Sequence, residues 1–175
     1  MKVLVTYASK YGSTKGIAEF IAEKLRERGA QVEVHGVAAV LNPCGYDAFV
    51  IGSAAYMGHW LKEAREFVSR NHSFLASRPV WLFSSGPLGT ETKDAHGRDV
   101  RDAAMPKEID EIKKSIKPRG HRVFFGALDS KKLSLGHKTI RRMPAARKLM
   151  PEGDFRDWKD IEAWADEIAA GLKAS

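Results

Sequence analysis

The amino-acid sequence predicts an α/β fold, a doubly wound parallel sheet of five strands with helices on both faces. Strand-like runs alternate with helix-like periods along the chain, an order typical of parallel sheets. The run DAFVIG at 47–52 is apolar at nearly every position, as expected of a strand that helices cover on both faces. The length of 175 residues and the apolar content of 43% suit one core, so we expect a single domain over 1–175.

Five strands are predicted from short β-rich or apolar runs between turn residues. They comprise residues 2–7, 31–35, 47–52, 79–84 and 122–128. Ligands of doubly wound sheets bind beyond the carboxyl ends of the strands, so the loops at that edge are the candidate site. These loops are 8–14, 53–59, 85–90 and 128–150.

Helices are predicted where apolar residues recur at helical spacing. The first covers the apolar positions from 17 to 25, and Gly29 closes it. A second helix is expected over 60–72. Pro106 opens a third, because proline suits the first helical position. Asp157 is expected to cap the last helix by accepting hydrogen bonds from its first N–H groups.

The loop after the first strand has the composition of an anion site. The free N–H groups and partial positive charge of a helix N-terminus attract anions, and hydroxyl side chains add donors. The spacing GxxxxGK[ST] of triphosphate loops is absent, which favours a monophosphate. The alternative is that Ser13 or Thr14 merely caps the helix. The candidate residues are Ser9, Lys10, Tyr11, Gly12, Ser13 and Thr14.

The pattern SKYGST after a first strand resembles the phosphate loop of flavodoxins, which hold FMN. Two further loops, GSAAYMGHW at 52–60 and SSGPLG at 84–89, match the flavodoxin loops that flank the isoalloxazine ring. The resemblance implies a flavodoxin-like sheet with strand order 2-1-3-4-5 and FMN as cofactor. The cofactor-binding residues that it implies in these two loops are Ala54, Ala55, Tyr56, Met57, Gly58, Ser85, Gly86, Pro87, Leu88 and Gly89.

A narrower resemblance concerns three segments: IGSAAYMGHWLKEAREFV, GHRVFFGALD and FRDWKDIEAWADEIA. They are similar to the flavodoxin-like, quinone-dependent (menaquinone-dependent) protoporphyrinogen oxidase family. That family also carries a long basic insert before the last helix, which corresponds to 129–154 here. The resemblance implies an FMN-dependent oxidoreductase of porphyrin biosynthesis that passes electrons from a reduced organic substrate, a porphyrinogen, to a quinone.

Two alternatives to this function stay open. The first is a flavodoxin-type electron carrier that docks redox proteins through its basic face, although ordinary electron-carrier flavodoxins are strongly acidic. The second keeps the same pocket but fills it with a deazaflavin cofactor, because a phosphate loop does not contact the ring atom that differs.

The net charge of +7 is concentrated in one segment. Residues 119–148 hold nine lysines or arginines and one aspartate, whereas the other 20 basic and 21 acidic residues nearly cancel. Such a patch attracts anionic lipid or a substrate with carboxylates, and a solvated basic loop is the simpler alternative. Nucleic acid suits the charge but not the fold or the loops. The patch residues are Lys131, Lys132, Lys138, Arg141, Arg142, Arg147 and Lys148.

Individual side chains near the predicted ring site have competing roles. We expect Tyr56 and Met57 to contact the flavin ring and Trp60 to pack in the core. His59 is a candidate proton relay, and the alternative is a local hydrogen-bond partner. The flavin carries the chemistry, so no other catalytic residue is predicted.

The remaining expectations concern location and metals. The single cysteine, Cys44, excludes an internal disulfide, and we expect it to pack near a turn. The six histidines lack HxxxH or HExxH spacing, so no metal is predicted. No signal peptide is recognised, and the longest uncharged run, 48–61, is too short to span a bilayer. We expect a cytoplasmic protein, with peripheral contact at the inner face of the cell membrane.

Overall fold

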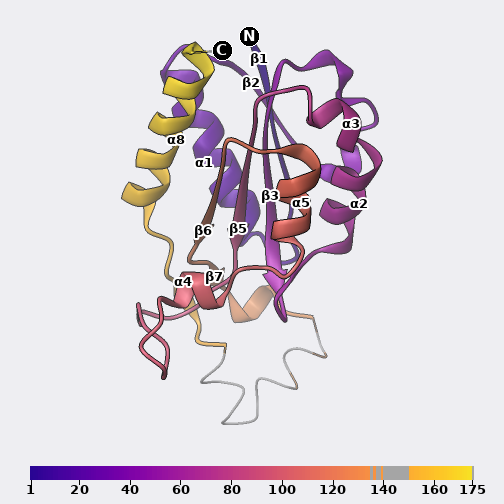
Figure 1. Ribbon diagram of the computed structural model, residues 1–175. Coiled ribbons are helices and arrows are strands. Elements are labelled where there is room, and N and C mark those ends of the chain that lie inside the picture. The colour runs from indigo at the N-terminus through magenta and orange to yellow at the C-terminus, as the bar shows by residue number, and fades with distance from the viewer. Residues whose placement is uncertain (135, 137–138, 140–149, 175) are drawn as a thin grey trace.

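The computed structural model describes residues 1–134, 136, 139 and 150–174 (Figure 1). Its central sheet has the strand order β2-β1-β3-β5-β6, and the neighbouring strands along this path are parallel. Counted along the chain, these five strands have the predicted order 2-1-3-4-5. Their bounds are Lys2–Ala8 (β1), Gln31–Gly36 (β2), Ala48–Tyr56 (β3), Val80–Ser85 (β5) and Gly120–Phe124 (β6).

The helices form two layers, one on each face of the sheet. Figure 1 shows α1 and α8 on one face and α2, α3 and α5 on the other. Between the layers β3 is buried at its first seven positions, which explains its continuous apolar run. The helix bounds are Ser13–Glu27 (α1), Lys62–Arg70 (α2), His72–Leu75 (α3), Val100–Ala103 (α4), Ile109–Ile116 (α5) and Trp158–Lys173 (α8).

Two hydrophobic clusters hold these layers together. On the α1 and α8 face, Phe83, Phe124 and Trp164 pack with ring centroids 5.5–6.2 Å apart. On the other face, Phe49 and Phe67 are fully buried. Both faces of the sheet therefore contribute to the core, as the sequence predicted.

Both predicted helix ends are confirmed. Gly29 follows α1 with φ +88°, the left-handed conformation common just after a helix. The Asp157 carboxylate accepts hydrogen bonds from the N–H groups of Lys159 and Asp160, each at 3.1 Å, at the start of α8. Local capping chemistry thus fixes the ends of the two helices that share a face.

The predicted helix over 60–72 is wrong at its start and its end. His59–Trp60 forms a short strand, β4, antiparallel to the end of β3. Met57 and Gly58 reverse the chain with φ +51° and +77°, as a two-residue hairpin requires. The helix that follows ends at Arg70, and the short α3 is separate. The helix predicted from Pro106 begins three residues later, at Ile109.

The fifth predicted strand, 122–128, is interrupted. β6 ends at Phe124, and Ala127–Leu128 (β7) pairs antiparallel with Gly153–Asp154 (β8). This pairing brings the two ends of the basic insert together beside the sheet. Short 3₁₀ turns cover Val37–Ala39 (η1), Pro43–Gly45 (η2) and Ser130–Lys132 (η3). Cys44 lies in η2 but is exposed, so its predicted packing role is wrong.

Candidate cofactor site

A cavity of about 460 Å³ lies at the carboxyl ends of β1, β3 and β5, the lower edge of the sheet in Figure 1. This volume falls in the range of pockets that bind cofactor-sized molecules. All three predicted loops contribute to its wall, although they are far apart in the sequence. The lining residues are Ser9, Lys10, Tyr11, Ser13, Thr14, Ala54, Ala55, Tyr56, Met57, Leu61, Ser85, Gly86, Leu88, Gly126, Ala127, Leu128 and Met150.

The first loop ends at the N-terminus of α1. Gly12 precedes the helix with φ +92°, a conformation that glycine adopts without strain, and its N–H donates to Ser9 Oγ at 3.1 Å. Among the residues that the structure describes, no side chain caps α1. The alternative that Ser13 or Thr14 merely caps the helix is therefore wrong, and the N–H groups of the first turn have no partner within the helix.

The two hydroxyl groups at the start of α1 have different surroundings. Ser13 Oγ accepts a hydrogen bond from the Ala127 N–H at 2.8 Å and lies 3.4 Å from Ser85 Oγ, so it joins the loop to β7 and β5. Thr14 is 1% exposed, and its Oγ1 has no hydrogen-bond partner among the described residues. A buried hydroxyl without a partner costs about 1–3 kcal/mol, so an anion bound at this loop would satisfy it.

The second loop places an aromatic wall across the cavity. The Tyr56 ring lies 6.4 Å from the Tyr11 ring at an interplanar angle of 67°, and Lys10 Nζ is within 5.4–5.6 Å of both ring centroids. Burial, and to a smaller extent Tyr11, raises the pKa of Tyr56 to about 12, so its hydroxyl stays protonated at neutral pH. Met57, at the hairpin turn, is 96% exposed and reaches only the rim.

The third loop closes the cavity beside β6. The Gly86 N–H donates to the Phe124 carbonyl at 3.3 Å, and the Pro87 carbonyl accepts from the Gly126 N–H at 2.8 Å. Ser85, Gly86 and Leu88 line the cavity, whereas Pro87 and Gly89 support the loop without lining it. Pro87 therefore positions the segment that follows β6.

Of the predicted cofactor-binding residues, four are absent from this lining: Gly12, Gly58, Pro87 and Gly89. Five others line the cavity without having been predicted: Leu61, Gly126, Ala127, Leu128 and Met150. The glycine within GAL at 126–128 is a signal that the predicted strand is interrupted after β6, because glycine inside a strand pattern weakens that strand.

The basic insert is described only at its two ends. Lys131 and Lys132 lie exposed in η3, and Lys132 lines a smaller cavity that adjoins the loop before α1. The other patch residues, Lys138, Arg141, Arg142, Arg147 and Lys148, lie outside the described residues.

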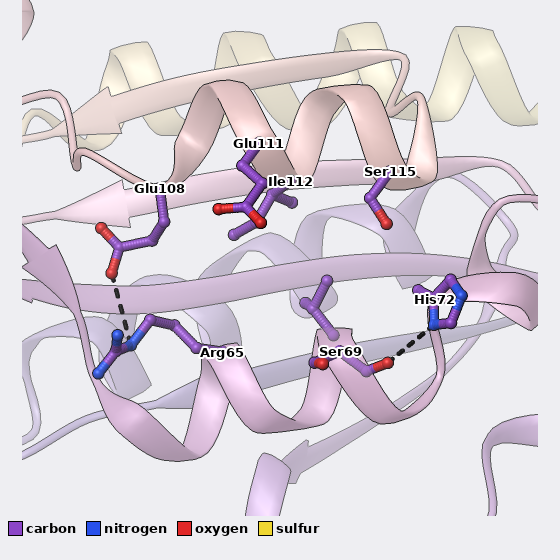
Figure 2. A pocket seen from close by; sticks show the side chains of 8 residues that line it. Arg65, Ser69, His72, Glu108, Glu111, Ile112 and Ser115 are labelled. Carbon is purple, nitrogen blue, oxygen red and sulfur yellow. Dashed lines mark hydrogen bonds and ion pairs between the residues drawn. The ribbon is translucent and has the colours of Figure 1, made fainter.

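His59 faces away from the cofactor cavity. Its Nδ1 is 3.3 Å from the Glu108 carboxylate, which also lies 3.4 Å from Arg65 Nε. Glu108 and Arg65 line a different cavity, of about 400 Å³, between α2 and α5 (Figure 2). Figure 2 shows the two side chains facing each other across it. The geometry favours the local-partner interpretation of His59, and its role as a proton relay stays a prediction.

Hydrogen bonds link Trp60, which follows the second loop, to Ser84 and His121 on the neighbouring strands. Trp60 is 1% exposed, which confirms its core packing, and its Nε1–H donates to Ser84 Oγ at 2.7 Å. Ser84 Oγ lies 2.9 Å from His121 Nε2. Burial, reinforced by Lys113, lowers the pKa of His121 to about 4, so the ring is neutral at physiological pH.

The described residues offer neither a metal cluster nor a membrane span. Within this part of the chain, no group of three or more His, Cys, Asp or Glu side chains is arranged to hold a metal ion. None of its helices has both the length and the hydrophobicity that a membrane crossing needs.

Comparisons with known proteins agree with this fold. The flavodoxin domain family matches residues 4–151, so the chain belongs to that family. Among solved structures, a cysteine-to-serine mutant of flavodoxin from Pseudomonas aeruginosa superposes with a TM-score of 0.61, at 18% identity over 99% of both chains. An archaeal flavodoxin gives a TM-score of 0.59 at 17% identity, also over 99% of both chains. Membership of this family implies that the chain binds a flavin.

Curated relatives are named oxidoreductases. The chain is 34% identical over 86 residues to protoporphyrinogen IX dehydrogenase [quinone] of Escherichia coli (strain K12), which covers 48% of each protein. It is 30% identical over 118 residues to NAD(P)H dehydrogenase (quinone) of Rhodopseudomonas palustris (strain TIE-1), over 55% of this chain and 59% of the relative. The chain thus spans about half the length of the curated relatives it matches.

Proposed function

We propose that the protein binds FMN in the 460 Å³ cavity and acts as an oxidoreductase that passes electrons from a reduced organic substrate to a quinone. The observation that carries the proposal is the buried Thr14 hydroxyl at the start of α1, which has no hydrogen-bond partner in the described part of the chain and lines a cavity walled by all three predicted loops. A phosphate at this helix N-terminus would supply its missing partner.

The residues present fit FMN. The first-turn N–H groups of α1 and Thr14 would hold the phosphate, and Tyr56 and Leu88 would face the ring from opposite loops. When bound, FMN supplies hydride and single-electron transfer. The chain's own part is to anchor the phosphate, to orient the ring and to keep a protonated Tyr56 hydroxyl beside it.

The alternative cofactor is a deazaflavin with the same phosphate end. Bound to the phosphate, neither Thr14 nor the α1 N-terminus would contact the ring atom in which the two cofactors differ. Absorption and mass of the copurified cofactor distinguish them, and we expect FMN because the flavodoxin fold implies a flavin.

For the substrate we propose a porphyrinogen, with a quinone as acceptor. The support is the name of the Escherichia coli relative, together with the charge of the cavity. Among its described lining residues Lys10 is the one cation, and no carboxylate accompanies it. A positive wall attracts an anionic substrate and favours the build-up of negative charge on a reduced cofactor.

The basic insert supports a further part of the proposal, peripheral contact with an anionic membrane. Its described ends are pinned beside the cofactor cavity by the pairing of β7 with β8. Lys131 and Lys132 are exposed there. A membrane surface contacted at this edge would place a lipid-soluble quinone near the site.

Stopped-flow absorption of the FMN-loaded protein tests the proposed reaction. We expect anaerobic protoporphyrinogen IX to bleach the flavin band and a quinone to restore it. A protein that protoporphyrinogen and NADPH leave oxidised, but that a soluble flavodoxin reductase reduces, is an electron carrier. Bleaching by NADPH alone would instead assign the quinone-reducing activity named for the Rhodopseudomonas palustris relative.

A further inference from the structure

A smaller cavity, of about 280 Å³, adjoins both the loop before α1 and the 460 Å³ cavity. Tyr11 and Ser13 line both cavities, and Gly12 lines this one. Its other wall comes from the region around β7 and β8, and carries four charged residues: Asp129, Lys132, Asp154 and Arg156. Charged side chains therefore face the loop that the proposed function assigns to the cofactor phosphate.

Among these four residues, Arg156 makes both an ion pair and a contact with an aromatic ring. Its Nε and Nη2 donate to the two oxygens of Asp154 at 2.7 and 2.5 Å, a bidentate pair. Its guanidinium lies 4.4 Å from the centre of the Trp158 ring, and its side chain is only 16% exposed. Two contacts thus fix the plane of the guanidinium, while among the described residues no acceptor bonds Nη1.

The free end of Arg156 lies against the first turn of α1. A Cβ built on Gly16 would stand 2.5 Å from Arg156 Nη1, so a larger residue at position 16 would force the guanidinium to move. The partial charge of a helix N-terminus is positive, and a cation beside it is unfavourable. The arrangement becomes favourable when an anion occupies the loop between the two.

Within the cavity, Asp154 balances the charge of Arg156 through Nε and Nη2, but neither Asp154 nor Asp129 accepts a hydrogen bond from Nη1. Asp154 is already engaged with the Nε side of Arg156, and this pairing holds the pKa of Asp154 below its usual value. Asp129 accepts the Lys131 N–H at 2.9 Å at the start of η3. Lys132 adds a second cation to the same wall.

We propose that Arg156 binds the terminal phosphate of the cofactor, with Nη1 as donor, and that Asp154, Trp158 and Gly16 position it. The proposal rests on the proposed function, because it takes FMN as the ligand. It adds to the helix N-terminus and the hydroxyls a cationic anchor that comes from the other end of the chain. Riboflavin, which lacks the phosphate, would gain nothing from this residue.

The test compares dissociation constants for FMN and riboflavin, measured by fluorescence titration of the apoprotein. Arg156→Gln is expected to weaken FMN binding about 10- to 100-fold and to leave riboflavin binding unchanged, since one charge-assisted contact is lost. Arg156→Lys is expected to recover part of the loss. Arg98→Gln is the matched control, because Arg98 also pairs with an aspartate, Asp94, but lines neither cavity.

Gly16→Ala provides a second variant that keeps every charge and raises helix propensity. Its Cβ displaces the guanidinium, so we expect weaker FMN binding in the parent and no further effect in the Arg156→Gln background. If Arg156→Gln loses equal affinity for FMN and riboflavin, or keeps its FMN affinity, Arg156 is not a phosphate ligand. Either result leaves the proposed FMN binding of the protein untouched. If the parent binds riboflavin as tightly as FMN, or binds neither of them, both the role of Arg156 and the proposed phosphate site are wrong.

Discussion

Replacing Thr14 by valine removes one buried hydroxyl and keeps the shape of the side chain. In the apoprotein Thr14 Oγ1 is buried without a hydrogen-bond partner among the described residues. Its removal relieves a cost of about 1–3 kcal/mol, so we expect Thr14→Val to raise the free energy of unfolding of the apoprotein by about 1 kcal/mol. In the FMN complex the same change removes a hydrogen bond to a charged group, worth about 1.5–3 kcal/mol. FMN should therefore bind about 10- to 100-fold more weakly.

Ser13→Ala is the matched control, one residue away, with the opposite expectation for stability. Ser13 Oγ already accepts the Ala127 N–H at 2.8 Å. Its loss leaves that donor without a partner, and we expect the apoprotein to lose about 1–3 kcal/mol.

Urea unfolding of the apoproteins and fluorescence titration with FMN and riboflavin measure both effects. Riboflavin affinity should change little in Thr14→Val. A Thr14→Val variant that is less stable than the parent and binds FMN equally well would refute the assignment of this hydroxyl to the phosphate.

Three further predictions concern His121, Tyr56 and the two exposed lysines of the basic insert. His121 has a lower pKa when folded, about 4 against 6.5, so the unfolded chain binds more protons between these values. Stability should then fall by up to about 3 kcal/mol as the pH drops from 6.5 to 4, and His121→Gln should abolish this loss in pH-dependent urea unfolding. Tyr56→Ala should shift the absorption spectrum and midpoint potential of bound FMN and weaken its binding by about 0.5–1.5 kcal/mol, as measured by titration. The substitutions Lys131→Gln and Lys132→Gln should each weaken binding to anionic liposomes by about 1 kcal/mol, as measured by sedimentation at low salt, and should leave FMN affinity unchanged.

Each of these has a contrary result. If His121→Gln keeps the same pH dependence, another group causes it; the exposed His72→Gln variant serves as the control. An unchanged spectrum and potential in Tyr56→Ala would mean that Tyr56 does not contact the ring. Liposome binding that is insensitive to both salt and the lysine substitutions would exclude an electrostatic contact through these residues.

Local patterns in the sequence predicted the strands, their order through the flavodoxin resemblance, and the helix ends at Gly29 and Asp157. The ends of the predicted strands indicated the three loops that line the cavity, and the flavodoxin resemblance supplied the individual residues of the second and third loops. Strands and helix ends depend on neighbours within a few positions of the sequence, and the place of the loops follows from the edge where parallel strands end. The helix predicted from position 60 was wrong because Met57, an unusual residue for positive φ, completes a hairpin turn.

What the sequence did not predict depends on contacts between distant residues. Ser13 and Thr14 look interchangeable in SKYGST, but Ser13 bonds the backbone 114 positions away and Thr14 does not. Arg156 lies 140 positions after Gly16 in the chain, and only the return of β8 beside β7 brings its guanidinium to the phosphate loop. No periodicity or spacing carries such a pairing.

We propose above all that the cavity formed by the three loops holds FMN by its phosphate. The most direct measurement is native mass spectrometry of the freshly purified protein, with the absorption spectrum of the released cofactor. We expect one FMN per chain in the parent and a lower FMN occupancy in Thr14→Val. A chain that carries no flavin and takes none up when FMN is added would contradict it.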